Sequence, residues 1–84
     1  MTTKTGPLVV ARTLYCARPP HYEIWLAGGD DPEGNALVFR TYDRALYDDA
    51  LDAEDTPQRF IAHWHADRSV RILDRLQPAE LLTP

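Results

Sequence analysis

Residues 36–53, ALVFRTYDRALYDDALDA, decide the predicted fold, because the hydrophobic pattern changes within them from that of a strand to that of a helix. Apolar and β-branched side chains over 36–41 favour a strand. Asp43 can then cap a helix that runs to about Ala53, since its side-chain oxygen can accept a hydrogen bond from a free amide of the first turn. The apolar stripe of this helix consists of Tyr42, Ala45, Leu46, Ala50 and Ala53.

Two more strands are expected before this stretch. Residues 8–16 are rich in β-branched and aromatic side chains, and the Pro19-Pro20 pair ends the strand because prolines supply no backbone donors. Residues 21–27 alternate as a second strand, and a loop of turn-forming residues follows over 28–35. Strict alternation predicts the faces to be Leu8, Val10, Leu14 and Cys16 against Val9, Ala11, Thr13 and Tyr15, then Tyr22, Ile24 and Leu26 against Glu23, Trp25 and Ala27.

The rest of the chain predicts a second helix and a fourth strand. Thr56 and Pro57 supply an N-cap and a proline in the first helical position, and we expect this helix to end near Asp67. Residues 70–76 alternate as a strand, after which a terminal helical turn is expected over 79–82. The core-facing stripe of the second helix consists of Phe60, Ile61 and Trp64.

The expected fold is therefore one small α+β domain over residues 1–84, with 1–6 and 82–84 flexible. Its elements follow the order β-β-β-α-α-β. They form a mainly antiparallel sheet of about four strands, with two helices packed on one face.

Charge and cysteine content narrow the class of partner. The net charge of −4 opposes binding to nucleic acid through its phosphates, so direct nucleic-acid binding is not the leading expectation. Cys16 is the only cysteine, which excludes an internal disulfide and favours the reducing cytoplasm. The apolar run at residues 8–11 is too short for a signal-peptide core or a membrane span.

An acidic cluster is the leading functional feature. Residues 43–55 hold six acids against Arg44, and two apolar side chains of the predicted helix fall outside its core stripe. Apolar side chains rimmed by charge suit a protein interface, although a sheet and a second helix covering both sides of this helix would explain them equally. The candidate partner-binding residues are Asp43, Tyr47, Asp48, Asp49, Leu51, Asp52 and Asp55, with Tyr15 and Trp25 on the sheet face opposite the helices.

We therefore expect a non-enzymatic protein-binding factor of the inhibitor, immunity or accessory type. Its partner would be a protein with a basic surface, or a second copy of the chain in a homodimer. No catalytic residue, metal ligand or cofactor site is predicted. Ser69 is the only serine and lacks the flanking glycines of a catalytic nucleophile, and Cys16 lies within an apolar strand.

Two alternatives remain open at this stage. His63 and His65 could support a metal-dependent or histidine-based activity, but residues two apart share a face only on a strand, and this segment is predicted to be helical. The second alternative is nucleic-acid binding through an aromatic sheet face with Arg71 and Arg75 of the last strand.

Overall fold

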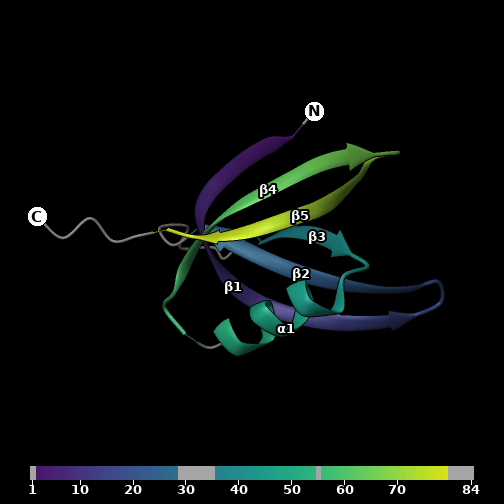
Figure 1. Cartoon of the computed structure of the whole chain (residues 1–84), viewed down its shortest axis with the longest axis horizontal. Coiled ribbons are helices and arrows are strands. Elements are labelled where there is room, and N and C mark those ends of the chain that lie inside the picture. The colour runs from purple at the N-terminus through teal and green to yellow at the C-terminus, as the bar shows by residue number, and fades with distance from the viewer. Residues whose placement is uncertain (1, 29–35, 55, 80–84) are drawn as a thin grey trace, which may run out of the picture.

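The computed structural model describes residues 2–28, 36–54 and 56–79 (Figure 1). These residues are mostly extended, and the single helix among them lies between the third and fourth strands. The elements in chain order are β1 (Thr3–Ala17), β2 (Pro20–Gly28), β3 (Ala36–Thr41), α1 (Arg44–Ala53), β4 (Arg59–Asp67) and β5 (Val70–Pro78).

The five strands form a closed barrel in the order β1-β2-β3-β5-β4, and β1 pairs with β4 to complete the circle. All neighbours are antiparallel except β3 and β5, which are parallel, with Arg40 opposite Ile72. This strand order, with the helix between β3 and β4, is the Greek-key arrangement of the small OB barrel. Because such barrels serve many unrelated functions, the fold alone assigns none to this chain.

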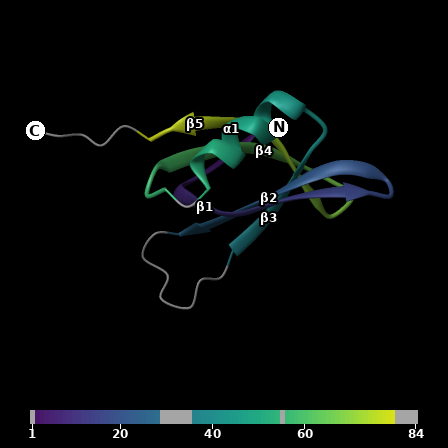
Figure 2. The same cartoon turned by 90° about the horizontal axis from the view of Figure 1, so that it is seen from below.

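The barrel interior is filled by large apolar side chains from all the strands and by one face of α1. Ile24, Leu26 and Phe39 are fully buried, and the Trp64 ring meets the Phe39 ring edge-on with centroids 5.8 Å apart. Helix α1 lies against β1 and β2 and is in front of the strands when seen from below (Figures 1 and 2). It contributes Leu46, Ala50 and Ala53 to the core.

The predicted α+β fold with two helices on one face of a four-stranded sheet is wrong, because residues 59–67 form β4 rather than a second helix. Phe60, Ala62 and Trp64 face the interior, so the hydrophobic period is two rather than that of a helix. Ala62 is fully buried, but its small side chain hides this alternation in the sequence. Thr56 and Pro57 lie in the loop before the strand.

The predicted faces of the first strand are wrong beyond residue 10 because β1 contains a bulge. The pairing of β1 with β2 shifts between Val10 and Arg12, so Ala11 is an extra residue in β1. Leu8 and Val10 face the core, but beyond the bulge it is Thr13 and Tyr15 that share the inward side with Ile24. Leu14 and Cys16 consequently lie on the other face.

The first residues of β1 close the barrel. Thr3 to Thr5, which we expected to be flexible, pair with β4, and the register then shifts between Thr5 and Leu8. Gly6 lies at this shift with a φ of +146°, and a Cβ atom added there would be 2.6 Å from the Phe60 carbonyl oxygen. The close approach of β1 to β4 therefore requires glycine at position 6.

Residues 79–84 bear on two further predictions. Ala79 follows β5 without a helical assignment, and its amide donates to the Arg59 carbonyl at 2.9 Å. The remaining residues of the predicted terminal turn, and the predicted flexible end, lie outside the described residues. Within the described residues, no helix has the length and apolar character needed to cross a membrane.

Candidate functional site

Helix α1 presents an acidic face to solvent. Asp43 caps the helix as predicted, because its Oδ1 accepts a hydrogen bond from the Ala45 amide at 2.9 Å. Arg44 lies 3.6 Å from Asp48 in an exposed ion pair. From Asp43 to Glu54 the chain carries five carboxylates and this single arginine. The exposed acids of the helix itself are Asp48, Asp49 and Asp52, whereas the predicted site residue Asp55 lies outside the described residues.

Three tyrosines form a row beside this acidic face. The Tyr22 ring stacks on the Tyr47 ring of α1 with centroids 4.4 Å apart, and the Tyr15 ring lies 5.3 Å from that of Tyr22. Tyr15 is 57% exposed, and Leu51, one helical turn after Tyr47, is 44% exposed. The fold thus brings together side chains that the sequence assigned to two separate surfaces. We call this the tyrosine–acid surface, formed by Tyr15, Tyr22, Tyr47, Asp48, Leu51 and Asp52.

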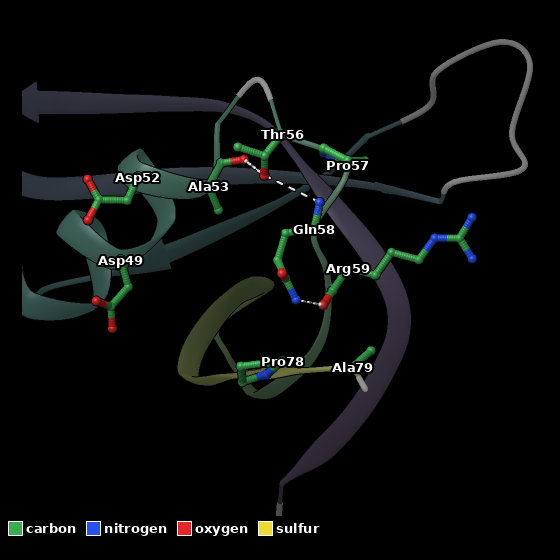
Figure 3. Close-up of a pocket in the computed structure, with 9 residues that line it drawn as sticks. All are labelled: Asp49, Asp52, Ala53, Thr56, Pro57, Gln58, Arg59, Pro78 and Ala79. Carbon is green, nitrogen blue, oxygen red and sulfur yellow. Dashed lines mark hydrogen bonds between the residues drawn. The ribbon is translucent and has the colours of Figure 1, made fainter. Parts of the chain in front are cut away.

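A hollow of about 980 Å³ opens at the C-terminal end of α1, where the chain turns toward β4 (Figure 3). Asp49 and Asp52 lie on one side of it, and the Arg59 side chain points away on the other (Figure 3). Thr56 fixes the turn because its Oγ1 donates to the Ala53 carbonyl at 2.7 Å. The hollow therefore has an acidic wall next to the tyrosine–acid surface.

Trp25 lies on the opposite face of β2 from Tyr22, and therefore also from Tyr15. These two predicted site residues do not form a common aromatic platform, because the bulge in β1 turns Tyr15 toward α1. The guanidinium of Arg12 lies 5.6 Å from the centre of the Trp25 ring. The Trp25 Nε1 group donates to Glu23 Oε1 at 3.4 Å.

A smaller hollow of about 220 Å³ lies on the Trp25 side of the sheet, between β2, β3 and the start of β5. Glu23, Arg40 and Arg71 contribute to its lining. The Arg40 Nε atom is buried and has no hydrogen-bond partner among the described residues. Arg75, which we grouped with Arg71 in the nucleic-acid hypothesis, is exposed and lies outside this lining.

His63 and His65 lie on the same face of β4, because the segment is a strand. This is the arrangement that the metal hypothesis required, but each ring has its own partner. His63 Nε2 donates to Gln77 Oε1 at 2.8 Å, and His65 Nδ1 donates to the Asp74 carboxylate at 2.9 Å. Within the described ranges, neither histidine belongs to a group of three close metal-ligating side chains.

Such a group does exist on the β1–β2 hairpin, where Cys16, His21 and Glu23 meet. One potential ligand atom of each lies within 4.8 Å of the others. His21 is buried, and its Nδ1 donates to the Pro19 carbonyl oxygen at 2.7 Å. Its Nε2 lies 3.3 Å from Glu23 Oε2.

The charges in this cluster depend on one another. Burial raises the pKa of the Cys16 thiol, and the negative charge of Glu23 and a hydrogen bond to it act in the same direction. Burial also opposes ionisation of Glu23, but its interactions with His21, Trp25 and Cys16 outweigh this effect and lower the pKa of the carboxyl. Near neutral pH the metal-free cluster therefore holds a carboxylate beside a neutral thiol.

Sequence reasoning missed this cluster, although a signal was present. A turn at residues 18–19 places Cys16 directly opposite His21 in the hairpin, and Glu23 is the next residue on the His21 face. The turn expected at Pro19-Pro20 implies this pairing of β1 with β2. Alternation along 8–16, however, assigns side chains only to the two faces of one strand and does not relate them to the neighbouring strand.

Comparison with known proteins adds no family to these observations. The sequence matches no protein-family model and no curated protein, and the structure of the chain matches no solved structure.

Proposed function

We propose that this chain is a non-enzymatic protein-binding factor that docks on a basic partner through the tyrosine–acid surface. An inhibitor, immunity or accessory role in the cytoplasm fits its size and its single cysteine. The observation that carries the proposal is the continuous row from Tyr15 through Tyr22 and Tyr47 to Leu51, which runs beside the acids of α1.

The composition of this surface supports a protein partner. Tyrosine is enriched at interface centres because a large, rigid ring buries much area for little loss of conformational entropy. Tyr15 and Leu51 are exposed, and Tyr47 is held in place by its stack on Tyr22. These side chains would form the apolar centre of the contact, and the acids would form its rim.

The acidic rim supports a basic partner. With Arg44 as the only basic residue of α1, Asp48 and Asp52 give this face a negative field that would speed encounter with a positive surface. The hollow beside Asp49 and Asp52 would accept a lysine or arginine side chain of that partner. Affinity should therefore fall as the salt concentration rises.

The test compares two double charge reversals. Asp48→Lys with Asp52→Lys alters the tyrosine–acid surface, whereas Asp67→Lys with Asp74→Lys makes the same change in net charge on β4 and β5. Each protein is immobilised and used to capture proteins from the native host, and captured candidates are then purified for titration. A true partner binds the wild type and the control variant, loses at least tenfold in affinity for the α1 variant, and shows a smaller salt dependence with it.

A second variant separates the apolar centre from the charges. Leu51→Asp should weaken the same interaction even though it adds a negative charge that would attract a basic partner, because it places a polar group at the centre of the contact. Candidates that bind both charge-reversed proteins and Leu51→Asp as tightly as the wild type would contradict the proposal. Sedimentation of the wild type alone tests the homodimer, which should dissociate on the same substitutions.

A second candidate function is the binding of single-stranded nucleic acid on the Trp25 side of the sheet. The Arg12–Trp25 pair favours it, as does Arg40 Nε, which lacks a partner among the described residues. Anisotropy of labelled single-stranded DNA and RNA at low salt tests it. Undetectable binding, or binding that Trp25→Ala leaves unchanged, would discard this candidate.

A further inference from the structure

We propose that Cys16, His21 and Glu23 form a zinc-binding site on the β1–β2 hairpin. This site lies on the other face of the hairpin from Tyr15 and does not depend on the protein-binding proposal. Among the residues that the structure describes, no other three side chains of this chemistry come as close together.

The spacing of the ligand atoms suits a tetrahedral ion. Two nitrogen or oxygen ligands, each about 2.0–2.1 Å from zinc, lie about 3.3–3.4 Å apart at the tetrahedral angle. His21 Nε2 and Glu23 Oε2 are 3.3 Å apart, and the Cys16 sulfur lies within 4.8 Å of one ring nitrogen of His21 and one carboxylate oxygen of Glu23.

The hydrogen bonds around the cluster orient its ligands. Because His21 Nδ1 donates to the Pro19 carbonyl, a neutral ring directs the Nε2 lone pair at Glu23 Oε2. Two acceptors facing each other need a proton or a cation between them. Trp25 donates to the other oxygen of Glu23, which leaves Oε2 for the ion. Histidine ligands of zinc typically have such a backbone carbonyl partner on their second nitrogen.

The ligand types select the metal. A thiolate, an imidazole and a carboxylate suit zinc, whereas magnesium and calcium prefer oxygen ligands alone. Three protein ligands leave the fourth tetrahedral position to a water molecule. The alternative is a metal-free hydrogen-bonded ion pair between His21 and Glu23, with the Cys16 thiol beside it.

Cobalt(II) distinguishes these two states, because it takes the same ligands as zinc and its thiolate complexes absorb in the near ultraviolet. Cys16 is the only cysteine, so a thiolate-to-cobalt band can come from no other residue. The wild-type protein, purified without a tag and freed of metal, is titrated with Co²⁺ and then with Zn²⁺. We expect the band to saturate at one Co²⁺ per chain and to disappear when Zn²⁺ displaces it.

Variants assign the other ligands. Cys16→Ser should abolish the band, and Glu23→Gln should weaken Zn²⁺ binding by more than about 100-fold, since loss of an outer-sphere group alone costs 10–100-fold. Glu23 is only half-buried, so this variant should fold, and circular dichroism verifies that it does. The control is His63→Gln with His65→Gln, which removes two histidines on β4 and should leave both the band and the affinity unchanged.

Three results would overturn the proposal: no cobalt band in the folded wild type, equal Zn²⁺ affinity of the wild type and Glu23→Gln, or loss of binding in the β4 histidine control. Failure of this site would leave the capture experiments on α1 unaffected, because those compare variants of a different surface.

Discussion

Glu54 joins the C-terminal end of α1 to the barrel, and its removal should destabilise the fold. Its Oε1 accepts hydrogen bonds from the Thr13 amide at 2.6 Å and from the Thr13 hydroxyl at 3.0 Å. Thr13 lies just beyond the bulge, where the amide faces α1 instead of another strand. The two residues are 41 positions apart in the sequence, so these bonds fix the packing of helix on sheet.

The expected loss for Glu54→Ala follows from these contacts. Two hydrogen bonds to a charged acceptor contribute about 1.5 kcal/mol each when half-buried. Removing a carboxylate from the negative end of the helix dipole returns about 0.3–1 kcal/mol. The free energy of unfolding should therefore fall by about 2 kcal/mol. This corresponds to a decrease of about 8–16 °C in Tm and of about 0.7–2 M in the urea midpoint.

Two further variants give this measurement its control. Glu54→Gln keeps an oxygen acceptor and should lose less than about 1 kcal/mol. Asp52→Ala removes an exposed carboxylate near the same end of α1 and should stay within about 0.5 kcal/mol of the wild type. If Glu54→Ala were as stable as Asp52→Ala in urea denaturation, the proposed stabilising role of the Glu54–Thr13 hydrogen bonds would be refuted.

Three other predictions concern the same fold. Gly6→Ala should lower the free energy of unfolding by about 2 kcal/mol, because its Cβ would meet the Phe60 carbonyl at a strained φ; a urea midpoint equal to that of the wild type would contradict this. Replacing Tyr22 and Tyr47 by leucine, singly and together, should give a coupling energy of about 0.5–1.5 kcal/mol, and additive effects would mean that the stack contributes nothing. With a chelator present, the interactions that lower the pKa of Glu23 also stabilise the fold at neutral pH. This contribution to stability is lost as the pH falls below the ordinary carboxyl pKa of 4.5. Urea midpoints across the acid range should therefore fall less steeply for Glu23→Gln than for the wild type, and parallel curves would argue against the shift.

Local signals predicted the helix but not the architecture around it. Asp43 and the stripe residues Leu46, Ala50 and Ala53 lie within a few residues of each other, so the sequence alone was enough to place α1, although Tyr42 and Ala45 of the predicted stripe are exposed. The same kind of signal failed at Thr56 and Pro57, because pairing of 59–67 with β1 and β5 outweighs a favourable helix start. Closure of the barrel depends on pairing between residues far apart in the chain, and no local sequence pattern predicts it.

The residues of the candidate sites were likewise only partly predictable from the sequence. Tyr47 and Leu51 could be recognised as lying outside the core stripe, because helical spacing is regular. Tyr15 joins them only through the bulge at Ala11, which alternation in the sequence does not reveal. Cys16 reaches a metal-ligating group only through the register of the hairpin, so its position in an apolar strand predicts no ligand role.

The bulge in β1 also interrupts the regular alternation of side chains between the two faces of the strand. Counted along the sequence, one extra residue reverses the side to which every later side chain of the strand points. Tyr15 serves the side that meets α1, and Cys16 serves the side that carries His21. Deleting Ala11 should therefore remove the irregularity and leave both assignments in place, because Arg12 would then follow Val10 as an ordinary strand residue opposite Trp25. With Ala11 present, a single backbone irregularity thus decides which side of β1 each of the two candidate sites occupies.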